Sequence, residues 1–445
     1  MLQHVERVVD LLDPALNVIY NMPIEEARRR VLCGGPSDVR AIDGSFALVA
    51  RDGITVRLAR SLDRPMRYFL AKRQEGPALF VADRIDTLHR ALDREGLAAQ
   101  FHPSYTRMVP AHFVLELRLV GCPDPDPTYT RFFDPPRGVL PPDLDEIGRR
   151  YIGALANEIE KWLTAVDRRT PAREEPIGVA FSGGIDSGAA LLVTYHTMLR
   201  LGLSPARLKA FTLNLGGGAD LDQARAFLDR LDLSMFLEEI TADPADLDVA
   251  ETVRTLEDYK PLDVECAAAG LLLSQGIRAR YPEWRYVIDG DGGDENLKDY
   301  PIEENTELTI RSVINNLMLY HEGWGVGRIK HSLTYSGGLS RGYARTYAPG
   351  RRHGFEEFSP FTRPDVVEVA EAIPFAALTN YDESALYGLK GEIVGRGVLA
   401  ITGFDMPIFP KRRFQDGVTS SQTRRSLLGG TELSYRQQFL SLYGG

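Results

Sequence analysis

The stretch Val179-Ala-Phe-Ser-Gly-Gly-Ile-Asp-Ser187 decides the fold, because in it a short apolar run changes into a helical pattern across two adjacent glycines. Adjacent glycines let the backbone curl so that successive N–H groups point into one concavity. The helix that follows adds its unpaired N-terminal amides and the positive end of its dipole. The stretch therefore predicts a phosphate-binding loop, with hydroxyl donors at Ser182 and Ser187.

The carboxylate of Asp186 needs a separate explanation. It cannot bind phosphate directly, and a bound Mg²⁺ is the natural reason for an aspartate in this loop. The alternative is a structural Gly-Gly turn in which Asp and Ser only cap the helix. The loop lacks the lysine of the G-x-x-x-x-G-K-[ST] motif, so it is a phosphate loop of a different class.

Strands and helices alternate along the chain around this loop. Strands are expected at Ile177–Phe181, Leu208–Leu215, Phe236–Ile240 and Tyr286–Ile288, with helices at 189–201, from Asp220, and at 264–279. An amphipathic helix opened by Pro142-Asp143 should precede them, and helices should dominate beyond about residue 305. This order predicts an α/β fold with a doubly wound parallel sheet and a helical C-terminal part.

The first part of the chain has a different pattern. Residues 41–90 contain short apolar runs separated by turn signals at Asp52-Gly53 and Gly76-Pro77, which is typical of β-strands. Residues 122–143 are rich in proline and aspartate and are expected to connect two domains. We therefore expect a smaller β-rich domain at 1–140 and a larger domain at 141–445.

Composition limits the classes of function. The 445 residues include 52 Lys and Arg against 62 Asp and Glu, a net charge of −10, which argues against a general nucleic-acid-binding protein. The three cysteines form no CxxC pair, so neither a disulfide framework nor a zinc ribbon is expected. There is no signal peptide pattern and no run of about 20 apolar residues. We expect a cytoplasmic protein that binds neither nucleic acid nor membrane.

A second unusual loop, Asp289-Gly-Asp-Gly-Gly-Asp-Glu295, follows the strand at Tyr286–Ile288. Loops at the carboxyl ends of strands in a doubly wound sheet line the ligand crevice. Four carboxylates in seven residues repel one another, so a cation or a proton must lie among them. Taken alone, the segment could also be a solvated acidic turn.

Together the two loops resemble the SGGxDS and GEGSDE motifs of the asparagine synthetase superfamily. Two further segments are similar to motifs of that family. Glu356-Glu-Phe-Ser-Pro-Phe361 resembles its EARVPF segment, and Lys411-Arg-Arg-Phe-Gln-Asp-Gly-Val418 resembles its KEQFSDGV. The Thr419-Ser-Ser421 that follows is similar to the lactam-forming branch, the β-lactam synthetases. The resemblance covers about residues 175–425.

The resemblance implies an adenine nucleotide α-hydrolase-like fold and an enzyme that uses ATP and Mg²⁺. ATP would adenylate a substrate carboxylate, pyrophosphate would leave, and an amine would attack the acyl group. The residues that match the family's nucleotide site are Ser182, Gly183, Gly184, Asp186 and Ser187 for the phosphates, Leu213 and Gly290 for the adenine, and Asp186 and Asp294 for Mg²⁺. Lys411 matches a lysine that stabilises negative charge during the reaction; otherwise it is a surface cation beside Arg412 and Arg413.

The group that accepts the proton of the amine is left open among three carboxylates. Asp291 is found where amide-forming relatives carry Glu and lactam-forming relatives carry Tyr. Glu357 lies near the glutamate that supports that tyrosine, whereas Glu356 fits the glutamate of the amide-forming relatives. We expect one of these two glutamates to be structural.

The first domain resembles a glutaminase with an N-terminal nucleophile, through segments such as Ile42–Ala47 and Ala82-Asp-Arg84. In that family a cysteine directly after the initiator methionine is the nucleophile; here the residue is Leu2. We expect a degenerate domain without glutaminase activity.

Without glutaminase activity, the expected substrates are a small carboxylic acid with an amine or ammonia. A homodimer and a separate ammonia-supplying or carrier protein stay open. The alternatives are a tRNA-modifying enzyme with the same phosphate loop and a non-catalytic nucleotide-binding homologue.

Overall fold

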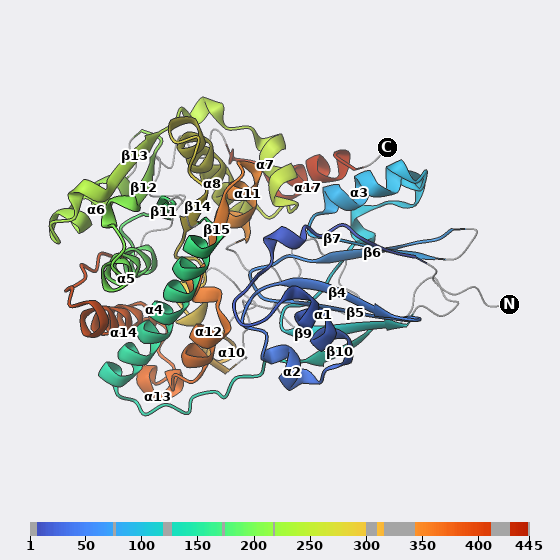
Figure 1. Ribbon diagram of the computed structural model, residues 1–445. Coiled ribbons are helices and arrows are strands. Elements are labelled where there is room, and N and C mark those ends of the chain that lie inside the picture. The colour runs from blue at the N-terminus through green and yellow to red at the C-terminus, as the bar shows by residue number, and fades with distance from the viewer. Residues whose placement is uncertain are drawn as a thin grey trace. The chain divides into compact units, whose positions relative to one another are not determined.

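The computed structural model describes residues 7–73, 77–118, 127–170, 174–216, 219–299, 309–315, 343–410 and 428–443. These residues form two compact units (Figure 1). The first contains the chain up to Asp134 together with its end from Arg436, and the second contains the described residues between Pro135 and Tyr435. The sequence placed the boundary between residues 140 and 141.

The first unit is built from two sheets, each four-stranded among the described residues, that enclose an apolar core. Side chains from both sheets, including Leu58, Tyr68 and Leu115, are buried against one another in this core. One sheet has the order β1 (Arg7–Asp10), β7 (Ala78–Ala82), β6 (Arg67–Ala71), β8 (Arg107–Met108), and the other the order β10 (Thr128–Arg131), β9 (Phe113–Arg118), β5 (Thr55–Arg60), β4 (Ala47–Asp52). The remaining elements are β2 (Val18–Ile19), β3 (Gly44–Ser45), α1 (Ile24–Cys33), α2 (Pro36–Arg40) and α3 (Ile85–Arg94).

The proline-rich segment 122–143 is only in part the connector that the sequence predicts. Residues 119–126 lie outside the described residues, but Thr128–Arg131 forms β10 and pairs antiparallel with β9. These four residues contain no proline, so each keeps the N–H group that a strand needs. The prolines on either side masked this short edge strand in the sequence.

The second unit contains a five-stranded parallel sheet, and its described part confirms the predicted α/β fold with a helical C-terminal part. The sheet order is β13 (Leu237–Thr241), β12 (Leu208–Asn214), β11 (Ile177–Ala180), β14 (Tyr286–Ile288), β15 (Glu356–Phe358). The chain moves outward from β11 to β13 and then returns to β14, so the strand order reverses between β11 and β14. Ligands of open α/β sheets bind outside the carboxyl ends of the strands at such a reversal.

Helices cover both faces of this sheet. Connections between parallel strands are right-handed as a rule, so the direction in which the chain moves along the sheet decides the face that each helix covers. The helices α5 (Ile185–Arg200) and α6 (Asp220–Asp229), on the way from β11 to β13, therefore cover one face. The helices α7 (Val249–Leu256) and α8 (Pro261–Arg280), on the way back from β13 to β14, cover the other. The long helix α4 (Leu144–Arg169) begins at its N-cap Asp143, whose side chain accepts from the amides of Asp145 and Glu146.

Beyond residue 305 the described chain is mainly helical, with one exception. Strand β15, which the sequence analysis did not predict, joins the sheet beside β14, with Ile288 opposite Phe358. Its three residues, Glu-Glu-Phe, are too few and too charged to produce a strand pattern. The described helices after β14 are α9 (Gly293–Asn296), which precedes residue 305, and then α10 (Ile310–Asn315), the π-helical turn η9 (Tyr343–Tyr347), α11 (Ala348–Arg352), the short turn η10 (Pro360–Thr362), α12 (Pro364–Glu371), α13 (Phe375–Thr379), α14 (Ala385–Thr402) and α17 (Glu432–Ser441).

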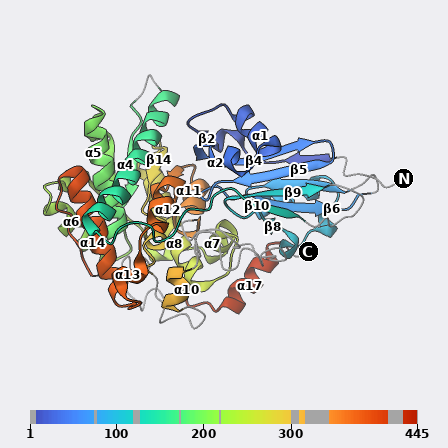
Figure 2. The same cartoon turned by 90° about the horizontal axis from the view of Figure 1, so that it is seen from below.

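Helices α4 and α14 pack against each other almost backbone to backbone (Figures 1 and 2). A Cβ atom at Gly397 would lie 2.3 Å from the carbonyl oxygen of Gly148, and one at Gly148 would lie 2.8 Å from the amide nitrogen of Gly397. Both distances are too short for any side chain. This contact fixes α14, which carries a buried lysine, against the helix that precedes the sheet.

Candidate active site

The predicted phosphate loop joins β11 to α5. Gly183 has φ +72°, and a Cβ atom there would lie 2.9 Å from the amide nitrogen of Ala224 in α6. Only glycine fits this position, because its backbone is left-handed and the space is filled. The hydroxyl oxygens of Ser182 and Ser187 lie 3.2 Å apart, and Ser182 accepts from the amide of Gly184 at 3.3 Å. The loop is thus closed by its own hydroxyls, with α5 beginning directly behind it.

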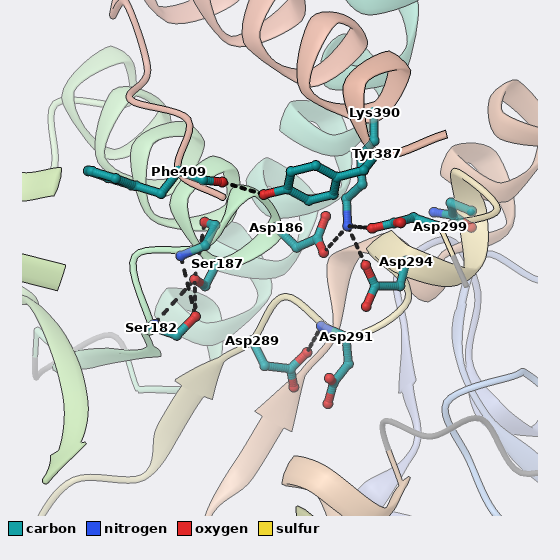
Figure 3. A network of polar contacts seen from close by, with 12 residues as sticks. Ser182, Asp186, Ser187, Asp289, Asp291, Asp294, Asp299, Tyr387, Lys390 and Phe409 are labelled. Carbon is teal, nitrogen blue, oxygen red and sulfur yellow. Dashed lines mark hydrogen bonds and ion pairs between the residues drawn. The ribbon is translucent and has the colours of Figure 1, made fainter. Parts of the chain in front are cut away.

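The second predicted loop, after β14, packs against the first turn of α5. A Cβ atom at Gly290 would lie 2.7 Å from the amide nitrogen of Ser187, and one at Gly293 would lie 2.3 Å from Oδ1 of Asp186. The two loops therefore touch, and they do so at the carboxyl ends of β11 and β14, where the strand order reverses. Figure 3 shows the side chains that this contact brings together.

A buried lysine that the sequence analysis missed links the two loops. The ammonium nitrogen of Lys390 lies 2.6 Å from Oδ2 of Asp186, contacts Oδ1 of Asp294, and is 3.7 Å from Oδ2 of Asp299 (Figure 3). Its side chain is 2% exposed. Burial would lower the pKa of Lys390, but the three carboxylates outweigh burial and hold it well above its usual value. Lys390 is therefore a fixed positive charge.

A signal for Lys390 was present in the sequence. Lys390 is four residues after Leu386 and three before Ile393, both buried, so it lies on the apolar face of α14. A charged residue on such a face is expected to have a buried partner. The pattern of one helix could not say which residues those partners are.

Asp186 and Asp294, the predicted Mg²⁺ ligands, are brought to the same ammonium group. Burial raises the pKa of Asp186 to about 7, against the opposing attraction of Lys390. Oδ1 of Asp186 is buried and has no hydrogen-bond partner among the described residues. In that part of the chain no group of three or more His, Cys, Asp and Glu side chains could hold a metal. Two carboxylates suit Mg²⁺, which usually takes its other ligands from phosphate and water.

A second cluster of carboxylates lies at the same edge of the sheet. Asp289 and Asp291, 1% and 6% exposed, share the hydroxyl of Thr346, which lies 2.9 Å from Oδ2 of Asp289 and 2.7 Å from Oδ2 of Asp291. The hydroxyl of Ser359 also donates to Asp289 at 2.9 Å. Burial raises the pKa of both aspartates. The charge of Asp291 raises the pKa of Asp289 further. At Asp291 the rise is opposed by Arg345, whose Nη1 lies 3.6 Å from Oδ1 of Asp291.

The two candidate glutamates of β15 point to opposite faces of the sheet, as neighbours in a strand do. Glu356 is bound by Arg285 at 2.6 Å and by Arg169 at 3.0 Å. Glu357 instead faces the cluster of Asp289 and Asp291. Burial first, and then these two aspartates, raise the pKa of Glu357 well above its usual value.

Glu357 also keeps an unused acceptor. Its Oε2 is buried without a hydrogen-bond partner among the described residues. The carboxyl reaches this position because residue 350 is glycine; a Cβ atom there would lie 1.7 Å from Oε1 of Glu357. Glu356 is thus held by two arginines, whereas Glu357 is buried with one acceptor atom unused.

Two predicted nucleotide-site residues are not part of these clusters. Leu213 is 2% exposed and packs with Ile240, Leu272 and Ile277 in the core between the sheet and α8, so its side chain is a core residue in this structure. Lys411, with the basic residues beside it and Thr419–Ser421, lies outside the described residues.

Of the three cysteines, Cys33 and Cys266 are among the described residues, and Cys122 lies outside them. Cys266 is buried in α8, close enough to Arg345 to affect its charge, and Cys33 is exposed at the end of α1. None of the helices in the described part of the chain has both the length and the apolar character needed to cross a bilayer.

Comparison with families of known proteins gives a match to part of the chain. Residues 160–333 match the family model described as Asparagine synthase. The matched range contains both loops, with Asp186, Asp289, Asp291 and Asp294, but ends before β15 and α14. No curated protein matches the chain.

Proposed function

We propose, from the premise that residues 160–333 belong to the asparagine synthetase superfamily, that the protein activates a carboxylic acid with ATP and transfers the acyl group to an amine. The family is one of ATP-dependent amide ligases. Adenylation of the acid, release of pyrophosphate and the absence of glutaminase activity are the further parts of the proposal. The observation that carries it is the contact of the two loops at the strand reversal, with Asp186 and Asp294 held around one cation.

The first cluster suits the triphosphate of ATP. The loop at Ser182–Ser187 offers hydroxyls and the N-terminal amides of α5, which favour anions. The buried ammonium of Lys390 adds a permanent positive charge. When bound, Mg²⁺ would be held by Asp186 and Asp294 and would neutralise charge on the leaving pyrophosphate. The acid would be adenylated where these groups meet.

The second cluster suits proton transfer. An attacking amine must lose a proton, and a carboxylate with a raised pKa accepts one near neutral pH better than an ordinary carboxylate does. Glu357 and Asp291 have raised pKa values, and Glu357 has a free acceptor atom. We assign the base to this pair, with Asp289 and the hydroxyl of Thr346 as the groups that share its proton.

The nitrogen would come from ammonia or from an amine substrate. Each of the three cysteines lies within the sequence, at residues 33, 122 and 266, so none has the free α-amino group that serves as base in an N-terminal-nucleophile glutaminase. The first unit would then be a scaffold. A separate protein that supplies ammonia or carries the acyl substrate fits the same proposal.

The test is a substrate screen with two readouts. The protein is incubated with ATP and Mg²⁺ and with a panel of carboxylic acids, amino acids and amines, with ammonia or glutamine as nitrogen source, while pyrophosphate and AMP are measured. We expect pyrophosphate release that depends on an acid, and an amide product with ammonia or an amine but not with glutamine. Release that requires tRNA would replace the proposal with a tRNA-modifying enzyme, and no binding of ATP would leave a non-catalytic homologue.

A further inference from the structure

The ammonium group of Lys390 occupies the place where two carboxylates from different loops converge. Asp186 belongs to the first turn of α5 and Asp294 to α9, and both contact the same nitrogen atom, with Asp299 at 3.7 Å (Figure 3). An ammonium group has three N–H donors, and here each faces a carboxylate.

This ammonium and a divalent cation compete for the same oxygen atoms. Mg²⁺ binds carboxylate oxygens at about 2.0–2.1 Å, so a metal bound to Asp186 or Asp294 would lie close to the nitrogen of Lys390. Two positive charges at such short range repel strongly in a buried site. The remaining oxygen of Asp186, Oδ1, is buried, and a metal bound there would be beside the same ammonium. One cation must therefore move before the other can enter.

The charges of the cluster show what would allow that exchange. Without the lysine, the carboxylates of Asp186, Asp294 and Asp299 would lose the ammonium group that all three face. With a nucleotide present, phosphate oxygens would offer the ammonium a new anionic partner and give the metal further ligands. Binding of metal and of nucleotide would then favour each other, and such coupling is reciprocal.

We propose that Lys390 stands in for the divalent cation in the nucleotide-free protein and excludes Mg²⁺ until a nucleotide binds. The proposal rests on the assignment of the first cluster as the metal–nucleotide site. It makes Lys390 a positioning residue: its ammonium holds the two aspartates in place while the site is empty.

The test measures metal binding and stability without any turnover. Mg²⁺ and Mn²⁺ are titrated into nucleotide-free wild type and Lys390→Gln by calorimetry, and thermal unfolding is followed with and without the metal. The variant should bind metal at least about tenfold more tightly than wild type, and the metal should raise its unfolding temperature, because a ligand of the native state stabilises it. Wild type should bind the metal with comparable affinity only when ATP is present.

A matched control is the other buried lysine of this region. Lys298 lies 2.6 Å from Oε1 of Glu371 and is 3% exposed. Lys298→Gln also removes a buried ion pair, but it should leave the metal affinity of the nucleotide-free protein unchanged. A second variant, Lys390→Gln with Asp186→Asn, also removes one of the two carboxylates that would bind the metal. This double variant should lose the metal-dependent stabilisation.

If Lys390→Gln fails to fold without metal, refolding in Mg²⁺ is the measurement, and recovery that the double variant lacks supports the proposal. Equal metal affinity of nucleotide-free wild type and Lys390→Gln would overturn it, and so would a gain of affinity in Lys298→Gln. These results do not depend on pyrophosphate release. A protein that exchanges the lysine for metal but forms no amide would refute the proposed function alone.

Discussion

Two clusters of buried carboxylates lie at the same edge of one sheet, and their charges are balanced in different ways. Asp186 and Asp294 share an ammonium group in direct contact. In the second cluster, Asp289 and Asp291 accept hydrogen bonds from hydroxyl groups, and Arg345 lies 3.6 Å from Asp291. Glu357 is near these aspartates, and the charge of Arg351 only partly offsets the rise of its pKa. In the first cluster a direct ammonium contact opposes the effect of burial on the carboxylates, whereas in the second cluster burial and neighbouring carboxylates favour bound protons. The difference teaches that one acidic loop can supply carboxylates to two clusters with different charge balance, and the proposed function uses one cluster for phosphate chemistry and the other for proton transfer.

The largest effect should come from removing a charge from the cation-balanced cluster. Asp186→Asn takes away an oxygen that would bind the metal and a partner of Lys390. We expect pyrophosphate release to fall roughly 100-fold or more, measured as initial rates at saturating ATP.

A folded protein is required for that result to count, so thermal unfolding of Asp186→Asn is measured beside the rate. If the folded variant releases pyrophosphate at the wild-type rate, the first cluster does not take part in the phosphate chemistry.

The next effect should separate the two clusters. Glu357→Gln keeps the shape of the side chain but cannot accept a proton. Amide formation should fall about 100-fold, within the range of general-base catalysis, while acid-dependent exchange of pyrophosphate into ATP continues.

The matched control is the neighbouring glutamate, which points to the other face. Glu356→Gln loses ion pairs with Arg169 and Arg285 and should keep amide formation within a few-fold of wild type. Loss of amide formation in Glu356→Gln but not in Glu357→Gln would reverse our assignment.

A smaller effect should follow from displacing one carboxylate in each cluster by a methyl group. Gly293→Ala would place a Cβ atom 2.3 Å from Oδ1 of Asp186, and Gly350→Ala would place one 1.7 Å from Oε1 of Glu357. Misplacement by about 1 Å can cost up to roughly 100-fold in rate. Gly293→Ala should lower pyrophosphate release, whereas Gly350→Ala should lower amide formation with adenylation preserved. Identical kinetic defects in the two variants would mean that the clusters act as one unit.

The smallest effect concerns stability and pH. Burial and neighbouring aspartates raise the pKa of Glu357, so the folded protein binds its proton more tightly than the unfolded chain does. Between the unfolded and the folded pKa, the native state therefore holds more protons and the free energy of unfolding falls as pH rises. Glu357→Gln should remove this part of the slope, measured by urea unfolding across neutral pH. An unchanged slope would show that Glu357 keeps an ordinary pKa.

The sequence was sufficient for the parts of the fold that rest on local pattern. The Gly-Gly pair between a strand and a helix located the loop after β11. The alternation of strand and helix patterns along the chain predicted the four strands β11, β12, β13 and β14. Strand β15 was missed because three residues, two of them glutamates, carry no periodic signal. It forms through parallel pairing with β14, which is a contact between distant segments.

The site was predictable where its residues are adjacent in the chain. Asp186 and Asp294 each stand in a recognisable loop, but the lysine between them comes from α14, about a hundred residues farther along the chain than Asp294. The choice between Glu356 and Glu357 also needed the sheet. Both residues are glutamates, and each has one Phe and one Glu as its neighbours in the sequence. Only the pairing of β15 with β14 decides which of the two faces Asp289 and Asp291.

The glycine contact between α4 and α14 makes the site vulnerable from a distance. Gly397 is seven residues from Lys390, about 10 Å along the helix axis at 1.5 Å per residue. A methyl group at Gly397 would push α14 away from α4, and the Lys390 ammonium on the same helix would move with it. The position of the Lys390 ammonium, and with it the charge balance of Asp186 and Asp294, thus depends on two glycines at a distant helix crossing, Gly148 and Gly397.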